Sequence, residues 1–392
     1  MKVLVISSMF PNNVQPVYGV FVKNRMAEVG KSCELKVVSP VPSTPLVGWM
    51  KRYAYRSKVA GHLNIDGLEV YYPRHFSIPK FFKPLDGLFF FFSLYLFAKR
   101  LKKVFDFDLI DAHLAYPDGF AAVLLGRLFK VPVTVTLRGH DIFDLPRYPV
   151  RGRQVKFALK QAARVFSVAR SLKEGAVELG IPAEKIKVIP NGVDTDKFYP
   201  VDRQSARREL GLDSREKIVL SVGHLVERKG FHLLIEAVSL LREDVPVSLI
   251  IIGSAGIEGD MKKYLENLAV SLGISDKVRF VQAMPHEELV MWYNASDLFC
   301  LASSREGMAN VLLEAGACGI PALAVNCWGN SEVIDNRDCG ILMENNDPEK
   351  IARGISQALN RTWNRKGISR RSQTWKTVAK RVVTEFERLL KT

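Results

Sequence analysis

The sequence predicts an α/β protein built from two doubly wound domains that face a cleft. Its 392 residues, 47% hydrophobic and 25% charged, suffice for two or three ordinary soluble domains. Short apolar runs such as Lys2–Ser8 alternate with stretches of helical spacing such as Val20–Val29, and the alternation begins again at Lys217–Val222. Strands that alternate with helices form mostly parallel sheets with helices on both faces.

The expected boundaries are a first domain over 1–198, a second over 199–364 and a C-terminal helix within 365–392. Apolar residues in the last segment, from Trp375 to Leu389, recur at helical spacing among many basic residues. The chain has no internal repeat and no low-complexity tract.

In the first domain, the strand Lys2–Ser8 leads through a loop to Gly19, just before the helix Val20–Val29. A glycine at this place lets the backbone approach a ligand closely, although an ordinary loop glycine is the alternative. The next predicted elements are strands at Leu35–Ser39 and Leu68–Pro73, a long irregular loop at 40–66 and an amphipathic helix at 81–105.

Two histidines follow neighbouring strands of the first domain. His113 ends the strand Leu109–His113, and His140 lies shortly after the strand Val133–Leu137, with a helix over 117–129 between the strands. Open parallel sheets bind ligands at the carboxyl ends of their strands, so both side chains are predicted to face one crevice. A structural role for each histidine remains the alternative.

The domain is completed by a basic helix over 151–163, a strand at Val165–Val168, a helix at Ser171–Leu179 and a strand at Ile186–Pro190. Asn191 follows in an Asn-Gly turn.

The second domain opens with the strand Lys217–Val222 and a turn that contains Arg228 and Lys229. A strand at Val247–Ile252 follows and leads into Gly253. The later elements are predicted at Val278–Gln282 (strand), His286–Asn294 (helix), Leu298–Ala302 (strand), 309–318 (helix), Pro321–Val325 and Gly340–Met343 (strands), and Pro348–Leu359 (helix).

Two carboxylates in this domain have an unusual setting. Glu306 lies in the loop before the helix 309–318, and Glu314 lies inside that helix, in an otherwise small and apolar stretch. The free N–H groups at a helix start favour an anion, which adjacent carboxylates would repel unless they bind its neutral parts. A nucleotide sugar has both parts, a diphosphate and sugar hydroxyls. The alternative is that Glu306 only caps the helix and Glu314 faces solvent.

The stretch 303–325 resembles the signature of the family 4 glycosyltransferases, retaining enzymes of the GT-B fold with two Rossmann-like domains. The family pattern is Glu-x7-Glu followed by Cys-Gly-x-Pro, and Glu306, Glu314, Cys318, Gly319 and Pro321 match it in register. The resemblance implies that Glu306 holds the donor sugar hydroxyls and Glu314 the ribose hydroxyls. It also implies that the last helix crosses back to the first domain.

The resemblance implies further site residues. Lys229 matches a family lysine that neutralises the donor diphosphate, and Arg228 is expected to supply the second charge, because His224 replaces the earlier family arginine. Arg138 takes the slot of a family histidine near the reacting carbon, so either Arg138 or His140 is expected to act there. The remaining donor and substrate contacts are expected at Gly19, His113, Asn191, Gly253, Gly307, Met308, Ala309, Asn310 and Val311.

The expected function is therefore transfer of a sugar, with retention, from a UDP- or GDP-linked donor to a glycan or lipid-linked acceptor, in cell-surface polysaccharide or glycolipid synthesis. No further cofactor and no metal are expected, because Asp106–Asp108 and Asp194–Asp196 are interpreted as strand-start and turn residues. The rivals are a nucleotide-sugar epimerase and a non-catalytic GT-B-fold subunit that binds glycans.

The charge is uneven. Residues 1–200 hold 30 basic and 16 acidic residues (+14), residues 201–360 hold 16 and 23 (−7), and residues 361–392 hold 10 and 2 (+8). The basic first half predicts an anionic partner, either a membrane surface or an acidic acceptor, rather than nucleic acid.

The expected location is the cytoplasm, at the inner face of the cell membrane. The N-terminus is too short for a signal peptide, the apolar run Leu88–Ala98 is about half a membrane span, and five cysteines without a Cys-x-x-Cys pair suggest reduced thiols and no structural zinc.

Overall fold

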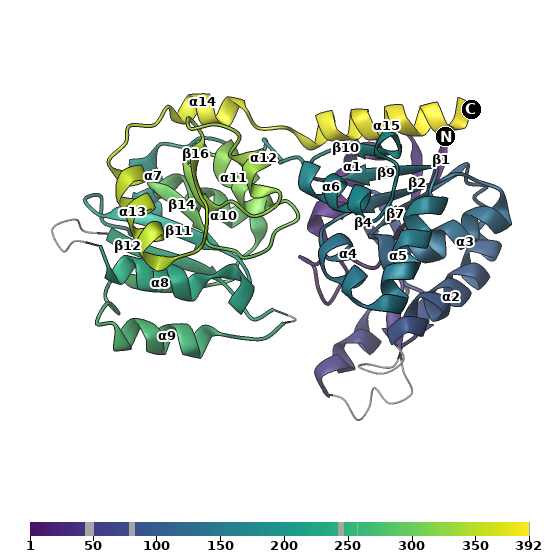
Figure 1. Ribbon diagram of the computed structural model, residues 1–392, viewed down its shortest axis with the longest axis horizontal. Coiled ribbons are helices and arrows are strands. Elements are labelled where there is room, and N and C mark those ends of the chain that lie inside the picture. Colours follow the sequence, from purple (N-terminus) through teal and green to yellow (C-terminus); the bar gives the residue numbers. More distant parts are fainter. Residues whose placement is uncertain (44–50, 78–82, 242–246, 257, 392) are drawn as a thin grey trace. The chain divides into compact units, whose positions relative to one another are not determined.

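The computed structural model describes residues 1–43, 51–77, 83–241, 247–256 and 258–391. The chain forms two compact units, one of residues 1–191 with 375–392 and one of residues 192–374 (Figure 1). The first stretch of unit one ends at residue 191, seven residues before the predicted 198, and the second unit ends at residue 374, ten residues after the predicted 364. The reason is packing, because Phe198 is buried in the core of the second unit and Ser369 donates a hydrogen bond to the Ala317 carbonyl there.

The first unit contains an eight-stranded sheet in the order β10-β9-β8-β7-β1-β2-β5-β4. Every pairing is parallel except that of β4 with β5, an antiparallel edge pair that the sequence did not reveal. The strands are β1 (Lys2–Ser7), β2 (Glu34–Val38), β4 (His62–Ile65), β5 (Leu68–Tyr71), β7 (Leu109–His113), β8 (Val133–Leu137), β9 (Arg164–Ser167) and β10 (Ile186–Val188). A separate small pair joins β3 (Val41–Ser43) and β6 (Arg74–Phe76).

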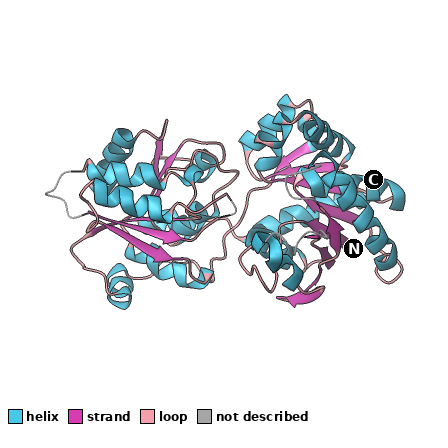
Figure 2. Ribbon diagram, turned by 90° about the horizontal axis from the view of Figure 1, so that it is seen from below, coloured by secondary structure: helices cyan, strands magenta, loops and turns pink. Residues whose placement is uncertain are grey.

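Helices lie on both sides of this layer of strands (Figure 2). They are α1 (Val20–Val29), α2 (Asp86–Leu101), α3 (Phe120–Phe129), the short α4 (His140–Phe143), α5 (Pro149–Gln161), α6 (Arg170–Glu178) and α15 (Trp375–Lys391). The return of the last helix to the first domain is confirmed, since Trp375, Val378 and Phe386 share a buried core with residues of α1 and β1.

Two predictions for this unit are corrected. The described part of the stretch 40–66 is not irregular: it contains β3, β4 and a 3₁₀ helix over Lys51–Lys58. The helix predicted over 81–105 is shorter, because α2 begins at Asp86 and ends at Leu101; residues 81–82 lie outside the described part.

The second unit contains a six-stranded parallel sheet in the order β13-β12-β11-β14-β15-β16. The strands are β11 (Lys217–Val222), β12 (Val247–Gly253), β13 (Val278–Gln282), β14 (Leu298–Leu301), β15 (Ala322–Val325) and β16 (Gly340–Met343). The helices are α7 (Arg203–Leu210), α8 (Phe231–Ser239), α9 (Lys262–Ser271), α10 (Leu289–Ala295), α11 (Asn310–Ala317), α12 (Asn330–Val333), α13 (Pro348–Leu359) and α14 (Arg365–Arg370).

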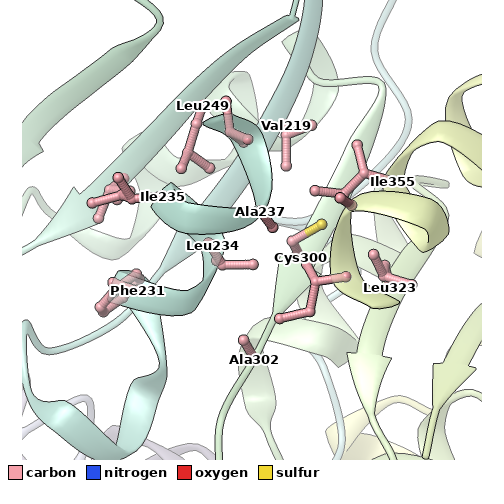
Figure 3. Packing of buried hydrophobic residues seen from close by; sticks show 14 of the residues in the cluster. Val219, Phe231, Leu234, Ile235, Ala237, Leu249, Cys300, Ala302, Leu323 and Ile355 are labelled. Carbon is pink, nitrogen blue, oxygen red and sulfur yellow. The ribbon is translucent and has the colours of Figure 1, made fainter. Parts of the chain in front are cut away.

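The core of this unit is continuous from the helices into the sheet. Phe231 and Leu234 of α8, Leu249 of β12, Cys300 of β14 and Ile355 of α13 are all almost fully buried in one cluster (Figure 3). Strands buried on both faces are near-continuous apolar runs, as in β12, which explains why their positions were predictable.

Counted along the second unit, its strands lie in the order 3-2-1-4-5-6, the doubly wound order of a nucleotide-binding domain. In such sheets, ligands bind beyond the carboxyl ends of the strands, where the order reverses. Here the reversal lies between β11 and β14, which places the loops that follow these two strands at the expected binding position.

Candidate functional site

The loops after β11 and β14 contact each other through close backbone packing. Gly230, which has a φ of +69°, lies so near Ala302 that a Cβ atom at Gly230 would be 2.3 Å from the Ala302 carbonyl oxygen. The Ser304 amide also donates a hydrogen bond of 2.9 Å to the Arg228 carbonyl. The two loops therefore hold Arg228, Lys229 and Glu306 in a fixed arrangement.

Lys229 and Glu306 form a nearly buried ion pair. Lys229 Nζ lies 2.6 Å from Glu306 Oε1, and each side chain is only 11% exposed. Burial alone would raise the pKa of Glu306, but the attraction and hydrogen bond of Lys229 outweigh it and lower this pKa, so the carboxylate is ionised.

Arg228 lies next to this pair. Its Nε donates to Glu258 Oε1 at 2.7 Å, and its Nη1 lies 3.9 Å from Glu306 Oε1. Both predicted diphosphate ligands are thus close together, and each is paired with a carboxylate. Arg228 lines a pocket of about 620 Å³, together with His232, Glu258 and Arg305.

Glu314 is buried on α11, and both of its carboxylate oxygens have partners. Oε1 lies 2.8 Å from His286 Nε2, and Oε2 accepts a hydrogen bond of 2.8 Å from the Tyr293 hydroxyl. Burial opposes protonation of His286, but the attraction of Glu314 and its hydrogen bond raise the His286 pKa overall. The Glu314 side chain therefore does not face solvent, and its carboxylate interacts with His286 and Tyr293.

The segment between the two carboxylates leads into α11. Gly307, Met308, Asn310 and Val311 are half-buried, and Ala309 is buried at the N-cap position. A helix of this kind leaves its first N–H groups without partners inside the helix. A Cβ atom at Gly329 would lie 2.1 Å from the Gly307 carbonyl oxygen, so the loop after β15 packs directly on Gly307.

The fold itself requires the two predicted contact glycines. Gly19 has a φ of +71°, and a Cβ atom there would lie 2.4 Å from the Met9 carbonyl oxygen. At Gly253 a Cβ atom would lie 1.9 Å from the Gly223 carbonyl oxygen. Each glycine is thus explained by close backbone packing within its own unit, whatever ligand lies nearby.

In the first unit, three predicted residues meet at the carboxyl ends of the strands. Arg138 Nη2 lies 2.8 Å from His113 Nδ1, and Arg138 Nη1 donates to Asn191 Oδ1 at 2.8 Å. The guanidinium also lies over the Phe21 ring, 5.0 Å from its centroid. Burial lowers the pKa of His113 to about 4 against the opposing attraction of Asp111, so this ring is neutral near pH 7.

His140 is not part of this cluster. Its side chain is 65% exposed, and Nδ1 lies 3.0 Å from Oδ2 of Asp144, the residue that follows the short helix α4. Of the two residues predicted for the slot near the reacting carbon, Arg138 lies with His113 and Asn191, whereas His140 lies at the surface.

Models of two known families match the chain. One, described as Glycosyltransferase Family 4, matches residues 51–197, and the other, described as Glycosyl transferases group 1, matches residues 202–375. The chain belongs to the family 4 glycosyltransferases. It is accordingly an enzyme of the transferase class.

Individual relatives agree with the family 4 assignment. A D-inositol 3-phosphate glycosyltransferase of Corynebacterium urealyticum is 33% identical over 65% of this chain and 63% of its own length. A putative teichuronic acid biosynthesis glycosyltransferase, TuaC, of Bacillus subtilis is 28% identical over 92% of this chain and 89% of its own length. The crystal structure of Anabaena HepE with UDP and glucose has a TM-score of 0.75 at 20% identity and covers 99% of both chains, which shows the shared GT-B fold.

Sequence reasoning missed several residues of this family 4 enzyme. His286 and Tyr293 form hydrogen bonds with Glu314 but precede it by 28 and 21 residues, so no local sequence pattern connects them with it. Asp141 was also missed. Its carboxylate accepts from the backbone amides of Ala115, Arg138 and Gly139, and so fixes the loop that carries Arg138.

Other features of the family 4 enzyme concern metals, thiols and membranes. All five cysteines are buried and none forms a disulfide. In the described parts of the chain, no three His, Cys, Asp or Glu side chains are grouped closely enough to hold a metal ion. Within the same parts, no helix has the length and hydropathy to cross a bilayer.

Proposed function

We propose that this glycosyltransferase transfers a sugar, with retention of configuration, from a UDP- or GDP-linked donor to a glycan or lipid-linked acceptor in cell-surface polysaccharide or glycolipid synthesis. The observation that carries the proposal is the Lys229–Glu306 pair at the point where the strand order of the second sheet reverses. Two similar proteins support the substrate class: TuaC, a putative teichuronic acid biosynthesis glycosyltransferase, and HepE, whose crystal structure is a complex with UDP and glucose.

In the proposed complex, the donor diphosphate binds beside Lys229 and Arg228. Two cations are suited to a group with two or three negative charges. Glu306 then accepts from sugar hydroxyls and Glu314 from ribose hydroxyls, since each oxygen of a carboxylate can accept more than one hydrogen bond. The nucleotide sugar is the co-substrate, and we propose that these cations stabilise the leaving group without a metal.

Retention is proposed to follow from a front-side displacement. In this reaction the acceptor oxygen forms its bond to the anomeric carbon on the face from which the diphosphate departs, and the departing diphosphate takes the acceptor proton. Electrostatic stabilisation of the leaving group then supplies most of the rate acceleration.

The test begins with a thermal-shift screen of nucleotide-sugar donors, because a ligand that binds the folded state raises its stability. The best donor identifies the nucleotide diphosphate to use. Lys229→Ala and Arg228→Ala should each weaken binding of this free nucleotide diphosphate roughly tenfold or more, which is the effect of losing one charge-assisted hydrogen bond. The double variant should bind almost none. Unchanged affinity in the double variant would exclude these residues from the site.

We further propose that the first unit docks reversibly on the cytoplasmic face of an anionic membrane, where a lipid-linked acceptor would lie. The helices α2, α3 and α5 pack in succession against one another. Along α2, Leu88, Phe92 and Leu96 are spaced to lie on one face, and they are 36%, 59% and 63% exposed. The basic residues Lys99, Arg100 and Lys103 follow, whereas the acidic residue within α2 is Asp86 at its start.

An exposed apolar face that continues into basic residues suits the boundary between acyl chains and anionic headgroups. Sedimentation with liposomes tests this. Binding should require anionic lipid, fall as salt rises, and weaken when Lys99, Arg100 and Lys103 are changed to Gln. Lys102 is left unchanged, because it is paired with Asp106 at 2.6 Å. Equal binding to neutral vesicles, or none to either kind, would favour a soluble acceptor instead.

A further inference from the structure

A chain of polar side chains leads from the interior of the first sheet to Arg138. Thr134 Oγ1 donates to Asp111 Oδ1 at 2.6 Å, Asp111 Oδ2 lies 3.3 Å from His113 Nε2, and His113 Nδ1 meets Arg138. Asp111, His113 and Thr134 are almost completely buried. Within the described residues, neither Asp111 Oδ2 nor His113 Nε2 has a hydrogen-bond partner, although the two atoms lie 3.3 Å apart.

The arginine decides the tautomer of the histidine. A guanidinium can only donate, so His113 Nδ1 must accept and the ring proton must be on Nε2. Asp111 Oδ2 lies 3.3 Å from Nε2, and the attraction between this carboxylate and a protonated Nε2 favours the same tautomer. Because burial keeps the pKa of His113 at about 4, the ring stays a neutral acceptor over the range in which the enzyme would work.

The opposite side of Arg138 is also fixed. Its Nη1 donates to Asn191, and Asn191 follows a segment that the fully buried Arg25 holds by donating to the Ile189 and Pro190 carbonyls at 3.0 and 3.2 Å. The ring of Phe21 supports the flat face of the guanidinium. The cation is therefore held at the carboxyl end of β8 in one orientation.

We propose that Asp111 and His113 are positioning residues that orient the Arg138 guanidinium so that it stabilises the negative charge that develops on the departing diphosphate. This inference rests on the proposed function and deepens it. A donor that is already oriented needs no reorganisation when charge develops, and this makes it more effective than a mobile one. The rival explanation is a buried polar network that only stabilises the fold.

The sharpest test compares two substitutions of His113. Asparagine places its amide oxygen near the position of Nδ1 and can still accept from Arg138, whereas glutamine places its amide near Nε2 and cannot do so at the same place. His113→Gln should lower kcat roughly 10- to 100-fold, the effect of one hydrogen bond to a charged group. His113→Asn should retain most of the activity. For both variants, the donor KM and the affinity for free nucleotide diphosphate should stay within about twofold of wild type.

A double-mutant cycle with Arg138→Lys provides the second readout, because residues that act through one another have non-additive effects. His113→Gln should cost little further activity once Arg138 is Lys. Full additivity, or equal kcat in the Asn and Gln variants, would overturn the positioning role. A lowered Tm with unchanged kcat would show a structural network instead. If the wild type bound no nucleotide diphosphate and transferred no sugar, the proposed function itself would fail, and the inference with it.

Discussion

The substitution Lys229→Met should destabilise the protein in a pH-dependent way. Methionine keeps the length of the side chain but removes the ammonium that lies 2.6 Å from Glu306, a carboxylate with only 11% of its side chain exposed. Removal of one partner of a buried pair costs about 3–5 kcal/mol, because the other charge stays buried without compensation. Arg228, at 3.9 Å, still offsets part of this cost, so we expect the lower end, about 3 kcal/mol.

The pH dependence follows from the Glu306 pKa. In the wild type this pKa is lowered, so the pair contributes stability above the unfolded-state pKa of about 4.3, and this contribution is lost as pH falls. Without Lys229, burial should raise the pKa instead. The variant should then be most destabilised at neutral and higher pH, and protonation of Glu306 should reduce the deficit as pH falls.

Thermal unfolding measured from pH 8 to pH 5 tests the prediction. A loss of about 3 kcal/mol corresponds to a fall in Tm of roughly 6–12 °C for a unit of this size. The matched control is Lys229→Met combined with Glu306→Gln, which removes the buried charge and should recover most of the loss. A deficit that is the same at every pH, or a double variant as unstable as the single one, would refute the reasoning.

Two further predictions concern the site. Glu314→Gln should mainly weaken binding of free nucleotide diphosphate, measured by calorimetry, whereas Glu306→Gln should mainly lower kcat. If both variants lose affinity and kcat to the same extent, the two carboxylates do not have separate roles. Arg138→Ala should lower kcat by a factor of about 10 or more, the effect of a charged hydrogen bond, whereas the exposed His140 should tolerate Ala with a change within about threefold. Equal losses in steady-state assays of these two variants would contradict the assignment of Arg138.

The elements that could be predicted from sequence are those with local causes. Apolar runs such as β12 and β11 had to be buried strands, and the helix with Glu314 was limited by Gly319, which has a φ of +74° and lies where a side chain would clash with the Arg365 backbone. Because each cause acts within a few residues, the positions of Glu306 and Glu314 relative to α11 could be predicted.

The parts that could not be predicted depend on partners far apart in sequence. Arg138 and Asn191 are 53 residues apart, and Lys229 and Glu306 are 77 apart. No local pattern shows that Lys229, the predicted phosphate ligand, forms an ion pair with Glu306, the predicted sugar ligand. Nor does any local pattern show that the His140 side chain lies at the surface. The predicted end of the first domain at residue 198 differs from the observed boundary for the same reason. Phe198 packs in the core of the second unit, where its ring contacts that of Tyr293, a residue far away in the sequence.

The most direct test of the central claim is a transfer assay with the donor selected by thermal shift, in which NMR follows the anomeric configuration of the product. The account predicts release of nucleotide diphosphate, a product with the same anomeric configuration as the donor sugar, and a strong loss of both with Glu306→Gln. An inverted product, or a Glu306→Gln variant as active as the wild type, would contradict it.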